Sequence, residues 1–143
     1  MRILGLDMGT KRIGVALSDE MGMLAQGKGF IIRKGTGPTL KEIRDIVLTE
    51  GVIRIVIGLP LNMDGSEGER AKDARSFALI VEKDTGKEVI LWDERLSTKE
   101  VEDIMIEADL SRRKRKGLVD KMAAQVILQG YLDFQNASRE LAN

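Results

Sequence analysis

The sequence contains neither cysteine nor histidine. Without cysteine, the chain forms no disulfides, has no thiolate nucleophile and cannot build a zinc–thiolate site. Without histidine, it lacks the commonest general base and the commonest ligand of transition metals. Catalysis would therefore use carboxylates, lysines, hydroxyls or the backbone, and a catalytic metal would be a hard cation bound by oxygen, such as Mg²⁺ or Mn²⁺.

Aromatic residues and long apolar runs are also scarce. Three Phe, one Trp and one Tyr are too few for a surface on which the bases of a nucleic acid stack. No stretch of about 18 apolar residues is present, so we expect no membrane span. The N-terminus lacks the residue order of a signal peptide, so we expect a cytoplasmic protein.

Neither sign of charge dominates, since 23 basic and 23 acidic residues give a formal net charge of zero. The overall charge therefore excludes a globally basic protein and identifies no partner. The basic residues nevertheless cluster in one unbroken run, which Lys121 follows: Arg112, Arg113, Lys114, Arg115 and Lys116. Such a run is often a solvated loop, but it also predicts a local anion-binding patch.

The pattern of apolar residues predicts an α/β protein, which we expect to be one domain spanning residues 1–143. Strands are expected at about 3–7, 13–17, 27–32, 52–57 and 89–92, and helices at about 39–50, 66–83, 97–108 and 117–134. Ser66 with Glu69, and Ser97 with Glu100, have the spacing of a helix-capping box. The order of elements predicts a five-stranded mixed sheet with helices on both faces: an antiparallel meander of three strands plus two parallel strands.

Acidic residues stand at three positions where the predicted sheet would place a site. Asp7 ends the first strand, Asp93 and Glu94 end the fifth, and Asp120 lies early in the last helix. Sites in α/β proteins form outside the strand ends, so Asp7 and Glu94 can meet there if their strands are close in the sheet. The two alanines that follow Asp120 within one helical turn would let the helix approach the sheet closely.

Three converging carboxylates in a chain without histidine suit two hard metal ions, about 3.5–4 Å apart, that clamp a phosphodiester. Clustered carboxylates repel one another unless cations neutralise them. Structural roles stay open for each acid. Asp7 could accept hydrogen bonds from its own turn, and Asp120 could stabilise the start of its helix. Only one of Asp93 and Glu94 can point inward, and Glu94 is favoured.

Two glycine-containing segments are alternative phosphate sites. The loop from Gly58 to Gly68 precedes a helix N-terminus and could bind a phosphate or close as a lid, but it matches neither the dinucleotide fingerprint nor the P-loop. The hairpin at 7–10 has the D-x-G-T pattern with which sugar-kinase and actin-like ATPases cradle phosphates. Those proteins need a second domain to close over the nucleotide, for which 143 residues leave no room.

Four separated motifs, in the right order, resemble the YqgF (RuvX) family across nearly the whole chain. They are GLDMGTKRIGVALSD at 5–19, GLPLNMDGSEGERA at 58–71, WDERLST at 92–98 and DKMAAQVILQGYL at 120–132. The resemblance implies an RNase H-like fold related to Holliday-junction resolvases, and a role in pre-16S rRNA maturation or junction resolution. It also implies that Asp7, Glu94 and Asp120 are the catalytic, metal-binding acids.

One stretch departs from the related resolvases. The fourth strand ends in Gly58-Leu59-Pro60 and carries no acid where those resolvases have one, so Glu94 must substitute from a neighbouring strand. A Ser/Thr-rich stretch follows the fifth strand. There, Ser97 and Thr98 either contact substrate phosphate or cap the next helix, and capping is the safer interpretation.

The sequence therefore predicts a Mg²⁺- or Mn²⁺-dependent endonuclease, with two ions, that acts on structured RNA, with branched DNA as the alternative substrate. The residues expected to position the phosphate backbone are Lys11, Arg12, Arg95 and the run from Arg112 to Lys116. The precursor of the small ribosomal subunit is a candidate partner, and we expect a monomer or a weak homodimer. Two other hypotheses stay open: a non-catalytic nucleic-acid-binding factor in ribosome assembly, and nucleotide binding by the first hairpin.

Overall fold

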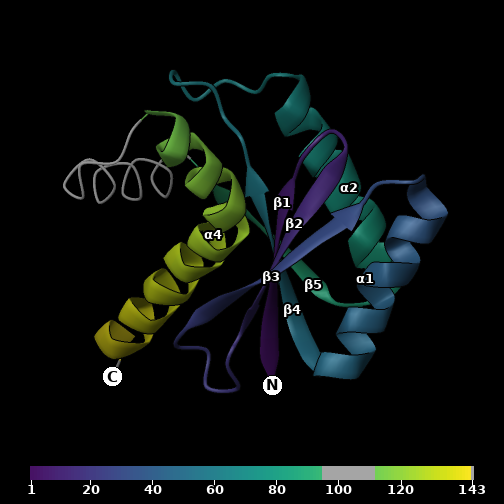
Figure 1. The fold of residues 1–143 in the computed structure, drawn as a ribbon. Coiled ribbons are helices and arrows are strands. Elements are labelled where there is room, and N and C mark those ends of the chain that lie inside the picture. Colours follow the sequence, from purple (N-terminus) through teal and green to yellow (C-terminus); the bar gives the residue numbers. More distant parts are fainter. Residues whose placement is uncertain (95–111, 143) are drawn as a thin grey trace.

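The computed structural model describes residues 1–94 and 112–142, which form a sheet with helices on both sides (Figure 1). For residues 112–121 and Ala142 it describes the helix but not the side chains. The strands are β1 (Arg2–Met8), β2 (Arg12–Ser18), β3 (Ala25–Ile32), β4 (Val52–Leu59) and β5 (Glu88–Asp93). The described helices are α1 (Thr36–Glu50), α2 (Glu69–Thr85) and α4 (Arg112–Ala142). The predicted helix at 97–108 lies outside the described residues.

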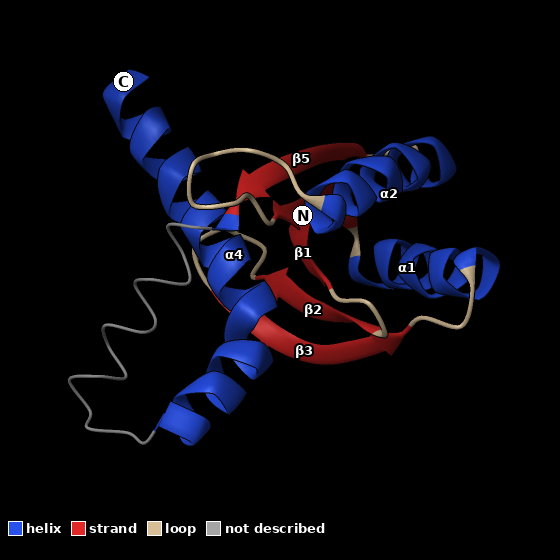
Figure 2. Ribbon diagram, turned by 90° about the horizontal axis from the view of Figure 1, so that it is seen from above, coloured by secondary structure: helices blue, strands red, loops and turns tan. Residues whose placement is uncertain are grey.

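The strands form one mixed sheet in the order β3-β2-β1-β4-β5, so β1 is central. β1, β2 and β3 pair antiparallel as a meander, whereas β4 pairs parallel with β1 and β5 pairs parallel with β4. Helices α1 and α2 cover one face of the sheet and α4 crosses the other, as the view from above shows (Figure 2). The predicted meander with two added parallel strands is confirmed.

The alternating side chains of β1 build a separate apolar core on each face of the sheet. Leu4, Leu6 and Met8 are buried in a cluster with side chains of α1 and α2. Ile3 belongs to a second cluster, which Leu128 and other residues of α4 complete. Because side chains two apart in a strand point the same way, the residues at 5 and 7 also face α4.

Aromatic side chains hold the outer strand β5 to α4. The ring of Trp92 in β5 meets Tyr131 of α4 edge-on, with 6.0 Å between the ring centres. It also lies 5.7 Å from the ring centre of Phe134, one helical turn further along. Such pairs contribute beyond their buried area, so this contact adds to the packing of β5 against α4.

Glycines in the central strands let α4 lie directly on the backbone of the sheet. A Cβ atom at Gly5 in β1 would stand 2.8 Å from the Cβ of Leu128. A Cβ atom at Gly14 in β2 would stand 3.3 Å from the Cβ of Ala124. Larger side chains at these positions would force the helix away from the sheet, because a packed core does not absorb added volume.

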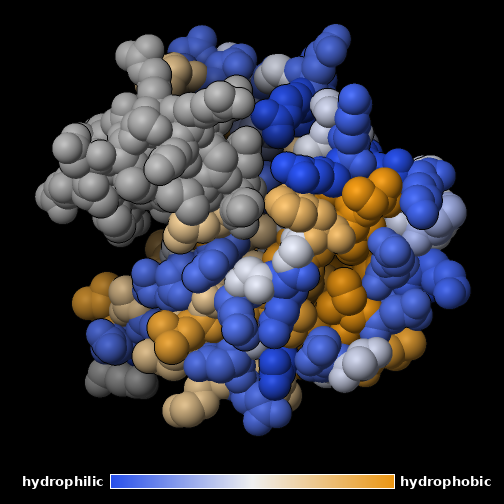
Figure 3. Space-filling model, viewed as in Figure 1, coloured by the Kyte–Doolittle hydropathy of each residue, from blue (hydrophilic) through white to orange (hydrophobic). Residues whose placement is uncertain are grey.

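A groove lies between α1 and the strands β2 and β3 on the opposite face. Its volume is about 330 Å³, and its apolar lining includes Val15, Leu17, Ile31 and Ile46. The space-filling view shows apolar side chains gathered on the side of the molecule where β3 and α1 lie (Figure 3). α1 therefore covers this end of the sheet less closely than α4 covers the other face.

The predicted start of the second helix at Ser66 is wrong. α2 begins at Glu69, with Gly68 as its N-cap residue and no capping hydrogen bond from a side chain. Ser66 instead bonds within the preceding loop: its N–H donates to Asp64 Oδ1 (2.9 Å), and Asn62 Nδ2 donates to its hydroxyl oxygen (3.0 Å). Local bonds to an aspartate compete with the capping box for this serine.

Two other helices are longer than the sequence predicts. α1 begins at Thr36 instead of Thr39, because Pro38 is tolerated in a first helical turn, where an N–H group has no partner in the helix. α4 runs from Arg112 to Ala142 instead of 117–134, and its extra turns are rich in arginine, lysine, leucine and alanine, which favour helix. None of the described helices is long and apolar enough to cross a membrane.

We expect Gly5→Ala to lower the free energy of unfolding by roughly 1–3 kcal/mol, because the added methyl group would overlap Leu128 on α4. Urea denaturation followed by circular dichroism measures the change. Gly37→Ala in α1 is the matched control, since a Cβ atom there meets nothing within 4 Å. Equal stability of the Gly5→Ala protein and the wild type would contradict the close packing of α4 on β1.

Candidate active site

Asp7 lies at the carboxyl end of the central strand, on the face that α4 covers. It stands opposite Gly14 of β2 in the antiparallel register. A Cβ atom at Gly14 would lie 3.3 Å from the Cβ of Asp7 and 3.3 Å from the Cβ of Ala124 on α4. The glycine therefore leaves space for a half-buried carboxyl group between the sheet and the helix.

Glu94 reaches the same place from the other side of β4. It follows β5, which β4 separates from β1. Gly58 of β4 pairs with Trp92, and a Cβ atom at Gly58 would lie 2.5 Å from Glu94 Oε1 and 2.6 Å from Ile127 Cδ1. The Glu94 side chain thus lies across bare backbone. The strand end that lacks an acid is the one that leaves room for Glu94.

The carboxyl groups of Asp7 and Glu94 share a hydrogen bond. Burial, the negative charge of Asp7 and this hydrogen bond raise the pKa of Glu94 to about 8, and the guanidinium of Arg70 opposes the rise. Two ionised carboxylates in contact repel each other, so the raised pKa of Glu94 favours its protonated form at neutral pH. The fold has concentrated acidic groups at one point, which only a proton or another cation can neutralise.

The structure describes the other two predicted acids to different extents. Asp93 is the half-buried last residue of β5, and its charge adds to the rise in the pKa of Glu94. Asp120 stands within α4, one turn before Ala124, but its side chain lies outside the description. Within the described residues, no third Asp, Glu, His or Cys forms a metal-binding group with Asp7 and Glu94.

The cations expected beside the acids follow β1 directly. Lys11 and Arg12 line a cavity of about 420 Å³ whose wall also includes Asp7. The guanidinium of Arg12 lies over the ring of Phe30, 4.1 Å from its centre. Arg95, the third expected cation near the strand ends, lies outside the described residues.

The basic run from Arg112 to Lys116 forms the first turns of α4. The prediction that it precedes the helix as a loop is therefore wrong, because lysine and arginine are good helix formers and extend the helix. Its side chains lie outside the description. Consecutive helical positions are about 100° apart around the axis, so five in a row do not share one face.

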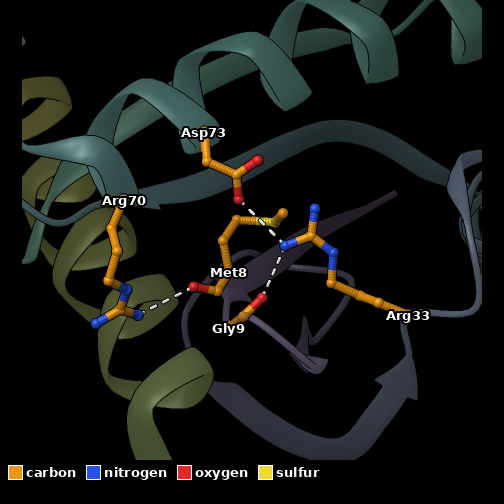
Figure 4. A network of polar contacts seen from close by, with 5 residues as sticks. All are labelled: Met8, Gly9, Arg33, Arg70 and Asp73. Carbon is orange, nitrogen blue, oxygen red and sulfur yellow. Dashed lines mark hydrogen bonds and ion pairs between the residues drawn. The ribbon is translucent and has the colours of Figure 1, made fainter.

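Two arginines that the sequence analysis did not single out hold the turn after β1 (Figure 4). Arg70, the second residue of α2, donates from Nη2 to the carbonyl oxygen of Met8 (3.1 Å). Arg33, which follows β3, donates from Nη1 to the carbonyl oxygen of Gly9 (2.8 Å) and pairs with Asp73 (3.1 Å). The sequence could have pointed to Arg70, because this residue lies near the start of a predicted helix that follows a loop at a strand end. No local pattern marks Arg33.

The loop between β4 and α2, an alternative phosphate site, uses its backbone groups internally. The N–H of Asn62 donates to the carbonyl oxygen of Ser66 (2.9 Å), and the N–H of Gly65 donates to that of Asn62 (2.8 Å). Leu61 and Glu67 form an isolated β-bridge across the loop. These N–H groups are therefore committed within the protein and do not form a phosphate cradle.

Comparisons with known proteins identify close relatives. A family model described as "RuvX: Holliday junction resolvase" matches residues 1–134. A protein of Halothermothrix orenii named "Putative pre-16S rRNA nuclease" is 53% identical over 136 residues, which cover 95% of this chain and 97% of that protein. A protein of the same name from Bacillus pumilus is 51% identical over 138 residues, covering 95% of this chain and 100% of that protein.

The fold is similar to that of a solved structure. The Thermus thermophilus RuvC structure aligns with a TM-score of 0.53 at 11% sequence identity, over 96% of this chain and 97% of that chain. At this identity the likeness concerns the fold alone. The expected RNase H-like α/β fold is thereby confirmed.

We expect the metal-free protein to lose stability as the pH rises from about 5 to about 8, because Glu94 keeps its proton up to a pKa of about 8 when folded, against 4.5 for an ordinary glutamate. Glu94→Gln removes this pH-dependent loss. Relative to the wild type, the free energy of unfolding of the variant should rise by at least about 1.4 kcal/mol between these two pH values, which is the equivalent of one pKa unit.

Urea denaturation in EDTA at both ends of the window measures this difference. Glu42→Gln, on the exposed side of α1, is the matched control and should leave the pH profile unchanged. A stability difference between the Glu94→Gln protein and the wild type that stays constant with pH would show that Glu94 does not hold a proton in the folded state.

Proposed function

The chain belongs to the RuvX family, and on this basis we propose that it is a metal-dependent endonuclease that cleaves phosphodiester bonds in structured nucleic acid. The proposed reaction is the processing of the 5′ end of the 16S rRNA precursor. The single observation that carries the proposal is the contact of Asp7 with Glu94, two carboxyl groups brought together across the bare backbone of Gly58.

The donor set at this contact fits a hard divalent cation. Asp7 and Glu94 offer only oxygen atoms, and the chain has no histidine or cysteine to add nitrogen or sulfur. Their shared hydrogen bond requires a proton. A cation can replace that proton, because carboxylates bind metals in the deprotonated form. We propose that Mg²⁺ or Mn²⁺, as two ions, binds here.

Asp120 enters the proposal as the third metal ligand through its position on α4. Positions four apart share one face of a helix, so position 120 belongs to the face of Ala124. Ala124 approaches Gly14 beside Asp7. The turn of α4 that precedes Ala124, and that contains position 120, therefore extends past the carboxyl end of β1, where the other two acids meet.

The residues of the chain have separate tasks in the proposed reaction. When bound, the divalent ions supply Lewis-acid stabilisation of the phosphoryl group and lower the pKa of the attacking water. Asp7 and Glu94 would hold the ions in their deprotonated forms, and the charge of Arg70 favours the loss of the proton from Glu94. Lys11 and Arg12 position the phosphate backbone beside them without reading sequence.

Structured RNA is the substrate that we propose first, since the relative at 53% identity is named as a pre-16S rRNA nuclease. Branched DNA is the second candidate, because the matching family model is described as a Holliday junction resolvase. Arg95 and the run from Arg112 to Lys116 extend the proposed backbone contacts. We further propose that residues 1–143 form one nuclease domain that acts in the cytoplasm on the precursor of the small ribosomal subunit, as a monomer or a weak homodimer.

We expect Asp7→Asn to lower the rate of metal-dependent cleavage by at least about 100-fold, because the amide cannot replace a carboxylate that holds a metal. The protein should still fold, since the change also removes a repulsive charge beside Glu94. Asp45→Asn is the matched control, as Asp45 lies on α1 in an exposed pair with Lys41. Full activity of the Asp7→Asn protein would remove Asp7 from the catalytic site.

A panel of substrates separates the candidate functions. It contains the precursor and mature ends of 16S rRNA and a four-way DNA junction, each incubated with Mg²⁺ or Mn²⁺. Cleavage of the precursor alone supports rRNA processing, and cleavage of the junction alone supports the resolvase. Salt-sensitive binding of RNA without cleavage in the presence of either metal would contradict the proposed nuclease function and favour a ribosome-assembly factor.

A further inference from the structure

Arg70 is anchored by one hydrogen bond, and most of its donors find no hydrogen-bond partner within residues 1–94 or the described side chains of α4. Its Nη2 donates to the carbonyl oxygen of Met8, and this bond holds the guanidinium next to the strand that carries Asp7 (Figure 4). A guanidinium has five N–H donors. The other donors of Arg70 have no hydrogen-bond partner among the described residues.

Arg70 lines the cavity of about 420 Å³ that contains Asp7, together with Lys11 and Arg12. The lining holds three cations and one acid, and Thr10 and Gly9 add small polar groups to it. A cavity of this size is typical of sites for small molecules, so it can accept a phosphate with its sugar. The positive charge is thus gathered around a space and not spread over a surface.

None of these three cations, Lys11, Arg12 and Arg70, is held in a direct ion pair within the described part of the protein. Arg33 lies on the other side of the same turn, and it differs in this respect because it pairs with Asp73 at 3.1 Å. A cavity lined by three cations and one acid carries an excess of positive charge, which indicates a site for an anion.

We propose that this cavity is a subsite for one backbone phosphate of the substrate, next to the phosphodiester that is cleaved, and that Arg70 is the residue that binds its oxygen atoms. The geometry suits an arginine, whose planar fork can donate two parallel bonds to a phosphate. The identity of the ligand rests on the proposed nuclease function. Because Arg70 is bonded to Met8, the phosphate is held at a fixed place relative to Asp7.

Binding without cleavage tests this subsite separately from catalysis. The probes are an end-labelled RNA hairpin and a four-way DNA junction, bound to the full chain in EDTA at a series of KCl concentrations. We expect Arg70→Ala to reduce the slope of log K against log [salt] by about 0.7–0.9, the value for one phosphate contact. Lys72→Ala is the matched control on the exposed side of the same helix, outside the cavity lining, and should leave the slope unchanged.

Two further measurements keep the result interpretable. Arg70→Lys keeps the positive charge and should keep most of the salt slope, and thermal denaturation shows whether each variant folds. If Arg70→Ala lowers the melting temperature but leaves the slope unchanged, Arg70 only supports the Met8 carbonyl group and the subsite is overturned. If the wild type cleaves neither probe in Mg²⁺ but the slope still falls in Arg70→Ala, the subsite is supported and the nuclease function fails.

Discussion

The close approach of α4 to the sheet is the constraint on which the rest of the structure depends. Two central strands carry glycine where the helix crosses them, so Leu128 and Ala124 contact the strands without intervening side chains. This contact closes the second apolar core and fixes how the helix lies relative to the end of β1. The space for Asp7 exists because Gly14 provides it under the same helix. Packing and site geometry therefore come from the same small residues.

The candidate site is arranged at the expense of local stability. Asp7 and Glu94 belong to strands that are not neighbours, and they meet because Gly58 has no side chain between them. Their contact brings two half-buried acidic groups together, and burial and the charge of Asp7 raise the pKa of Glu94. Functional sites are where proteins depart from the rules that stabilise the remainder of the fold. The two apolar cores, which flank the sheet on both faces, offset this local loss of stability.

Much of the fold could be predicted from the sequence, because alternating apolar residues and turn residues are local signals. The strands, the mixed sheet and the carboxyl-end position of Asp7 and Glu94 follow from them. The role of Gly58, which leaves room for the Glu94 side chain, does not follow from local signals, because it depends on β4 lying between β1 and β5. Arg70 and Arg33 were also missed, because their bonds to the turn after β1 join residues 62 and 24 positions apart. The predicted start of α2 was wrong because Ser66 forms hydrogen bonds with Asn62 and Asp64 in the loop and does not cap the helix.

The aromatic contact between β5 and α4 has a practical consequence. Trp92 is the only tryptophan of the chain, and it stands two residues before Glu94 while its ring touches Tyr131 and Phe134. Its emission spectrum depends on how closely those rings and the helix exclude water. The protein thus carries an intrinsic fluorophore at the junction of its outer strand, its last helix and its acidic pair. The docking of α4 can be followed in unlabelled protein by this signal alone.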